Sequence, residues 1–182
     1  PKVGAQLRED AIAALLYAII GILIYTAFRF DFVFAPGAVV ALIHDALITV
    51  GYFSIFNVEF TLGTVAAVLT VIGYSINDTI VIYDRVRENQ AKYRDWSLAN
   101  CINLSMNEMM GRTILTSLLT IFTVLSMLVL GGGLVKDFAI ALLVGMVSGV
   151  YSTMFVAAPV TLWVEKLIEK AKQRRMVAAA RS

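Results

Sequence analysis

Five long apolar stretches constrain this 182-residue chain more than any other feature of its sequence. A helix crosses the hydrocarbon core of a bilayer with about 20 apolar residues, at about 1.5 Å per residue. The chain is 59% hydrophobic and 15% charged, whereas soluble domains carry about 25% charged residues. We therefore predict an all-α fold, a polytopic membrane helix bundle with five transmembrane helices. The predicted spans cover residues 9–28, 34–56, 61–84, 110–130 and 137–163.

The segments outside these spans carry most of the basic residues and predict the orientation of the bundle. Short connections make neighbouring helices antiparallel, so five spans place segment 85–109 and tail 164–182 on the same side. Both segments are rich in lysine and arginine, and the positive-inside rule makes their side cytoplasmic. Apolar residues are interspersed among the basic ones of 85–109, so we expect it to form an amphipathic helix along the membrane surface. The tail is expected to be cytoplasmic, and residue 1 to lie outside.

Small residues recur at helical spacing in the third and fifth spans, where they predict close packing of helix backbones. Gly145 and Gly149 form a GxxxG pair in the fifth span, and Pro159 is expected to kink the same helix near its end. The two stripes consist of Gly63, Ala66, Ala67, Thr70, Gly73 and Asn77, and of Ala141, Gly145, Ser148, Gly149 and Ser152.

Asp78 is the polar residue that most needs an explanation. It lies six residues before Asp84, about 9 Å inside the cytoplasmic end of the third span. A charged side chain at the bilayer centre costs roughly 2.5–3.5 kcal/mol on insertion scales, so an acid inside the membrane is by default a candidate functional site. Tyr74 and Asn77 extend the polar stripe on the same helix. The alternative is that Asp78 snorkels to the interface or only holds helices together.

Arg112 is the predicted partner of Asp78. It begins the fourth span at the cytoplasmic end, one turn before Thr116, and antiparallel packing places it at the depth of Asp78. A nearby guanidinium favours the ionised carboxylate, whereas low dielectric favours the neutral acid. A small helix movement would therefore switch the protonation of Asp78, as a proton carrier requires. A static ion pair between two helices is the alternative.

His44 and Asp45 lie about ten residues into the second span, near the middle of the bilayer. Adjacent helix positions point about 100° apart, so one of the two faces the bundle while the other faces elsewhere. Asp45 is the second candidate for a proton pathway because of its depth. His44 is expected to hydrogen-bond a neighbour, although histidine also titrates near neutrality.

Several function classes are excluded by what the sequence lacks. Its single cysteine, Cys101, allows no internal disulfide, and no cluster of metal ligands accompanies it. No phosphate-binding glycine loop, Ser/His/Asp constellation or GxGD protease segment is present. The net charge of +2 is too small to indicate nucleic-acid binding. We therefore expect no enzymatic activity, no catalytic residue, no cofactor, no metal and no nucleic-acid partner.

Segment 73–89, which reads GYSINDTIVIYDRVREN, closely resembles the signature of the SecF family, membrane subunits that work with SecD in bacterial protein export. The resemblance extends over nearly the whole chain, and no single motif in it is specific alone. The other matching positions are Val3-Gly4, Leu7-Arg8, Gly37-Ala38, Ala41-Leu42, His44-Asp45, Arg112-Thr113, Thr116-Ser117, Gly131-Gly132, Gly149 and Tyr151-Ser152.

The resemblance implies a location, a partner and a mechanism. The chain would form an RND-like half in the bacterial inner membrane, without the family's first helix and periplasmic domain. SecD would supply the related half, with the SecYEG translocon and a translocating polypeptide as further partners, and protons would drive the cycle. Asp78 and Arg112 match family positions implicated in proton conduction. A non-conducting scaffold for SecD and the translocon, or half of an RND-type small-molecule exporter, are the alternatives.

Overall fold

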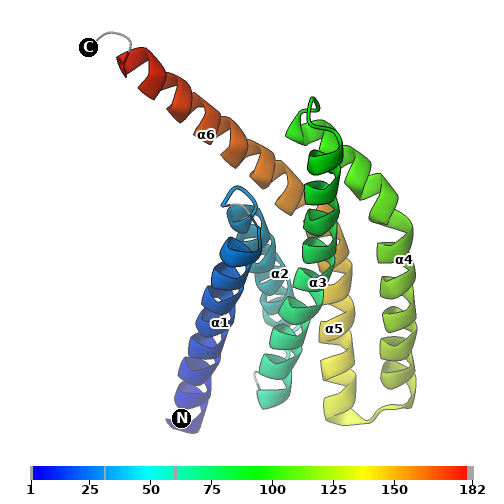
Figure 1. The fold of residues 1–182 in the computed structure, drawn as a ribbon. Coiled ribbons are helices and arrows are strands. Elements are labelled where there is room, and N and C mark those ends of the chain that lie inside the picture. Colours follow the sequence, from blue (N-terminus) through cyan, green and yellow to red (C-terminus); the bar gives the residue numbers. More distant parts are fainter. Residues whose placement is uncertain (1, 31, 60, 180–182) are drawn as a thin grey trace.

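The computed structural model describes residues 2–30, 32–59 and 61–179, and these contain helices and no strand (Figure 1). Five helical stretches are long and apolar enough to cross a membrane, which confirms the predicted all-α class. Helices α1 to α5 lie side by side, and α6 leaves the bundle obliquely (Figure 1). The helices are α1 (Lys2–Arg29), α2 (Ala35–Ile55), α3 (Leu62–Lys92), α4 (Leu98–Leu130), α5 (Gly133–Ser152) and α6 (Ala158–Ala179).

A π-helical segment, Thr153–Ala157, joins α5 to α6. It ends two residues before Pro159, which has no amide hydrogen for the helical bond to the carbonyl four residues earlier. A wider i→i+5 turn is one way in which a helix absorbs such an interruption. The basic tail predicted for 164–182 continues as helix to the end of α6 at Ala179.

Segment 85–109 does not form the separate surface helix that the sequence predicts. Its first part is the end of α3 and its second part is the beginning of α4, with a short turn between them. The turn ends at Ser97, whose hydroxyl accepts a hydrogen bond from the Asn100 amide and so caps α4. The apolar residues of the segment pack between the two helices, where Cys101 is 1% and Ile102 4% exposed. Periodicity alone cannot distinguish this hairpin from a helix on the membrane.

Helices α3 and α5 pack closely against each other. A Cβ atom on Gly145 would lie 2.5 Å from Cγ1 of Val71, and one on Gly149 would lie 3.1 Å from Cβ of Ser75. The predicted role of these two glycines is therefore confirmed. Gly73 differs, because a Cβ atom there would meet nothing within 4 Å. It belongs to the predicted stripe by spacing, but it points away from α5.

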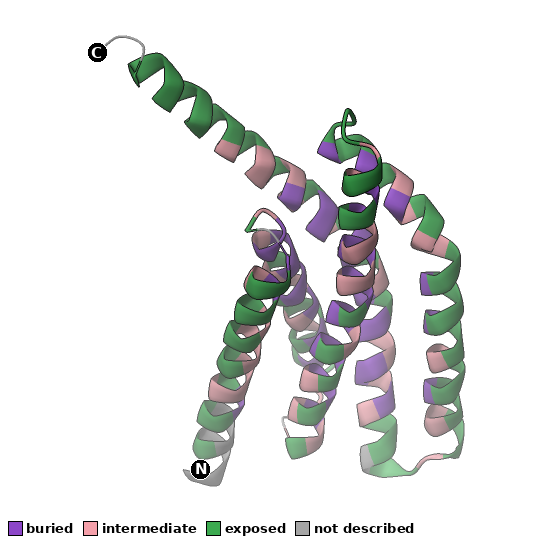
Figure 2. Ribbon diagram, viewed as in Figure 1, coloured by how far each residue is buried: buried purple, intermediate pink, exposed green. Residues whose placement is uncertain are grey.

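Exposed apolar side chains cover the outside of the bundle, and the buried residues line the inner faces of the helices (Figure 2). Phe28 is 90% exposed and Leu119 67% exposed, although both lie on helices that are long enough to cross a membrane. Such a surface suits lipid or another membrane helix. Arg29, at the end of α1, forms a salt bridge of 2.6 Å with Asp84 within α3, and the pair marks where the apolar spans end.

Candidate functional site

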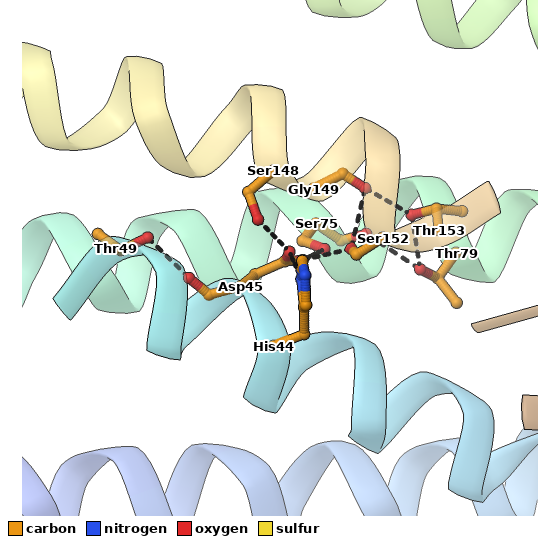
Figure 3. A network of polar contacts seen from close by, with 9 residues as sticks. All are labelled: His44, Asp45, Thr49, Ser75, Thr79, Ser148, Gly149, Ser152 and Thr153. Atoms are coloured by element: carbon orange, nitrogen blue, oxygen red, sulfur yellow. Dashed lines mark hydrogen bonds and ion pairs between the residues drawn. The ribbon is translucent and has the colours of Figure 1, made fainter. Parts of the chain in front are cut away.

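Asp45 lies completely buried where α2, α3 and α5 meet (Figure 3). Its carboxylate accepts hydrogen bonds from three serine hydroxyls. Ser75 on α3 and Ser152 on α5 donate to Oδ2 over 2.5 and 2.6 Å, and Ser148 on α5 donates to Oδ1 over 2.7 Å. A buried carboxylate is costly unless it is paired or hydrogen-bonded, and these three donors supply that compensation.

The close approach of α5 to α3 explains how the serines reach Asp45. Ser148 and Ser152 are four residues apart, so they lie on one face of α5. Gly145 and Gly149 share this part of the helix and leave no side chain between it and α3. Larger residues at the two glycines would hold the hydroxyls away from the carboxylate. The small residues therefore serve a polar site as well as backbone packing.

Hydrogen bonds extend this polar cluster along α5 and α3 (Figure 3). The Thr153 hydroxyl, in the first residue of the π-helical segment, donates to the Gly149 carbonyl over 2.9 Å. It also lies 3.0 Å from the hydroxyl of Thr79 on α3. On α2, Thr49 donates to the backbone carbonyl of Asp45 over 2.8 Å. The cluster thus joins Asp45 to the place where α5 gives way to the π-helical segment.

His44 lies beside Asp45 and contacts it directly. Its Nδ1 is 3.1 Å from Oδ1 of Asp45, and its side chain is 31% exposed. The expected hydrogen bond between His44 and a neighbour is therefore present. The expectation that one of the two residues faces the bundle and the other does not also agrees with these exposures.

Asp78 occupies a different environment on α3. The residue is only 7% exposed, yet it forms no hydrogen bond with any residue in the described part of the chain. Arg112 lies close enough for the two charges to interact, but it makes no salt bridge with Asp78 within 4.0 Å. The predicted pair is therefore near in space without being in contact. Arg112 instead lines an open cleft of about 280 Å³ together with Asp84, Arg85 and neighbouring residues of α3 and α4.

Of the predicted supporting residues, Tyr74 and Thr116 form hydrogen bonds with each other's helices, whereas Asn77 does not take part. The Tyr74 hydroxyl donates to the Thr116 carbonyl over 3.2 Å and also contacts the Thr120 hydroxyl, which links α3 to α4. The Thr116 hydroxyl in turn donates to the Arg112 carbonyl over 3.0 Å. Asn77 is exposed, so it does not share the buried environment of Asp78.

Sequence reasoning did not identify the serines as partners of Asp45. Ser148 and Ser152 belong to the small-residue stripe of the fifth span, and their spacing of four residues was the available signal. Ser75 lies in the third span next to Tyr74, and nothing in its local sequence indicates a contact with the second span. Among the residues that the structure describes, no group of three or more histidines, cysteines or acids could hold a metal ion.

Membrane-length helices and two buried carboxylates define the class: this is a multi-pass helical membrane protein with acidic groups inside its bundle. Residues 1–167 match the family described as "Protein export membrane protein SecD/SecF, C-terminal". The chain belongs to this family.

Named relatives agree with the family. The chain is 52% identical over 159 residues to protein translocase subunit SecF of Koribacter versatilis, which covers 87% of this chain and 39% of that protein. It is 46% identical over 169 residues to SecF of Calditerrivibrio nitroreducens, covering 92% of this chain and 56% of the relative. The chain thus spans about half the length, or less, of these curated relatives.

Solved structures show the same arrangement of helices. The crystal structure of SecDF from Thermus thermophilus, described as a translocon-associated membrane protein, matches with a TM-score of 0.86 and 42% identity. That match covers 91% of this chain and 23% of the SecDF chain. The super-membrane-facing form of SecDF matches with a TM-score of 0.81 and 40% identity over 97% of this chain.

Proposed function

We propose that this chain is the membrane part of an accessory subunit of the Sec protein translocase, which uses the proton-motive force to promote polypeptide export across the bacterial inner membrane. The observation that carries the proposal is the environment of Asp78. It is a buried acid in a membrane-length helix, and no hydrogen bond within the described chain holds it in one protonation state. An acid of this kind, in a family of export proteins, suits reversible proton binding.

Asp78, Arg112 and Asp45 have distinct parts in this proposal. Asp78 takes up and releases a proton, and the approach or withdrawal of Arg112 shifts its balance between the two states. Asp45 is a second acid on the pathway, held by its serines at the centre of three helices. One charge that crosses 100 mV releases about 2.3 kcal/mol, so a few protons per cycle suffice to drive a conformational change. No covalent catalysis, cofactor or metal is part of the proposal.

SecD is the proposed partner within the membrane, with the SecYEG translocon and the exported polypeptide as further partners. The apolar outer faces of the bundle suit contact with helices of SecD as well as with lipid. The basic side chains of α6 lie beyond the Arg29–Asp84 pair and support a cytoplasmic C-terminus.

Replacing Asp78 with asparagine tests the proposal. In vesicles that contain the full-length protein with SecD and the translocon, Asp78→Asn should abolish proton flux and strongly reduce preprotein export. Asp95→Asn makes the same chemical change at an exposed residue of the α3–α4 turn and is the matched control. Unchanged flux in Asp78→Asn would refute the assignment of Asp78 as a carrier.

The scaffold alternative makes a different prediction for the same variant. If the buried polar groups serve packing alone, Asp78→Asn should lose export only to the extent that it loses assembly with SecD. Copurification of SecD with the variant separates these outcomes, since a conducting subunit should keep its partner and lose its flux.

A further inference from the structure

His44 connects the buried Asp45 carboxylate to the surface of the bundle. Asp45 is 0% exposed, and each of its three serine partners is at most 8% exposed, so the serines present little surface to the outside of the bundle. The His44 side chain is 31% exposed while its Nδ1 lies 3.1 Å from Oδ1 of Asp45. Of the described side chains that contact this carboxylate, His44 is the most exposed.

The exposed part of His44 lines an open groove of about 560 Å³ between α2 and α5. Its walls are mainly apolar, with His44, Ser148 and Tyr151 as the polar members. Ser148 both lines the groove and donates to Asp45, so groove and buried cluster share a wall.

We propose that His44 is the proton-exchange residue of Asp45, through which the buried carboxylate gains and loses its proton by way of the α2–α5 groove. The inference rests on the proposed function, because it supplies a route to the second acid of the pathway. A water molecule that enters the groove delivers a proton to Nε2 of His44, which forms no hydrogen bond with any described residue. The proton on Nδ1 then passes to Oδ1 of Asp45, which leaves a neutral imidazole and a neutral acid. Release is the same transfer in reverse.

The surroundings allow this transfer. Ser152 also lies within hydrogen-bonding distance of the Gly149 carbonyl, 3.2 Å away, so its hydroxyl has another acceptor when Asp45 becomes neutral. Tyr151 on α5 is the titratable group whose ring lies beside His44, with 6.1 Å between ring centroids. On α3, Asp78 is the acid nearest in sequence to Ser75. Among the described residues, no lysine, arginine or glutamate forms a salt bridge or hydrogen bond with His44 or Asp45.

His44 is the only histidine in these 182 residues, so a single ring signal reports on this part of the protein. The experiment is nitrogen-15 NMR of histidine-labelled protein, assembled with SecD in nanodiscs, with His44→Gln used to assign the signal. We expect the protonation of the ring nitrogens to depend on pH, and this dependence to change in Asp45→Asn, because the substitution removes the carboxylate that contacts Nδ1. Asp78→Asn is the matched control and should leave the pH dependence of the ring signal nearly unchanged. The inference would be overturned if the ring signal did not change with pH, or if it changed in the same way in Asp45→Asn as in the wild type.

Proton flux gives the second readout, measured in sealed vesicles that contain the full-length protein with SecD and the translocon. Glutamine keeps a hydrogen-bonding group beside Asp45 but cannot relay a proton, so His44→Gln should slow flux about a hundredfold, a typical contribution of general acid–base groups. Wild-type flux in His44→Gln, with flux abolished in Asp78→Asn, would overturn the inference and leave the proposed function standing. Wild-type flux in Asp78→Asn would instead count against the proposed function, while the NMR titration still decides the coupling of His44 to Asp45.

Discussion

Replacing Gly145 with alanine should separate α5 from α3 and disrupt the Asp45 cluster. The new Cβ would lie 2.5 Å from Cγ1 and 2.9 Å from Cβ of Val71, whereas carbon atoms pack at about 3.5–4.0 Å. The helices must therefore move apart by about 1 Å or more. Overpacking of this kind costs about 1–3 kcal/mol, and alanine returns at most about 1 kcal/mol through helix propensity.

The same displacement should lengthen the hydrogen bonds that Ser148 and Ser152 make with Asp45, now 2.7 and 2.6 Å. Each buried hydrogen bond that is left unmade costs about 1–3 kcal/mol. We therefore expect Gly145→Ala to lower the free energy of unfolding by about 2–4 kcal/mol in all, measured by equilibrium unfolding in micelles.

Gly73→Ala is the matched control for Gly145→Ala, because its Cβ would meet nothing within 4 Å. It should leave stability unchanged or raise it by up to about 1 kcal/mol. Adding Val71→Ala to Gly145→Ala removes the clashing methyl groups and should recover part of the loss. The reasoning is refuted if Gly145→Ala is as stable as Gly73→Ala, or if the second substitution recovers nothing.

Three further predictions concern other contacts. Ser152→Ala should lower the free energy of unfolding by about 1–3 kcal/mol, because it removes a donor to a buried carboxylate, while Ser126→Ala, at an exposed helical position, should stay within about 0.5 kcal/mol. Gly37→Ala should also lower it, because the new Cβ would lie 2.6 Å from a backbone carbonyl oxygen of the π-helical segment. Outside the membrane, the hydrogen bond from Arg85 lowers the pKa of Glu108 from 4.5 to about 2. The contribution of Glu108 to stability is thus fully present above about pH 4.5 and is lost as the pH falls toward 2, and Glu108→Gln should flatten this dependence in an unfolding titration.

The predictable part of the fold follows from the cost of burying polar groups in lipid. Apolar length alone is enough to predict five membrane helices, and the rarity of intramembrane acids is enough to select Asp45 and Asp78. The structure of segment 85–109 could not be predicted in this way. Its mixture of basic and apolar residues suits a membrane surface and a helical hairpin equally well, and contacts such as the 2.9 Å hydrogen bond from Asn89 to Ser105 favour the hairpin.

The partners of the acids were harder to predict than the acids themselves. Opposite charge makes Arg112 the natural partner of Asp78, but in the described part of the chain no hydrogen bond or salt bridge joins the two side chains. Asp45 is held by neutral hydroxyls from helices 30 and 107 residues away in sequence. Such pairings depend on how the helices rotate about their axes, which the glycines of α5 determine through close packing. The glycines can be read from a single sequence, but the rotation of the helices about their axes cannot.

The most direct test of the account is the protonation of Asp78 in the assembled complex, followed by infrared difference spectroscopy during acidification. We predict a carboxylic-acid carbonyl band that appears as the pH falls and is absent from Asp78→Asn, while the Asp95→Asn control keeps it. A spectrum that is identical with and without the Asp78 carboxyl would contradict the claim that this buried acid binds and releases a proton.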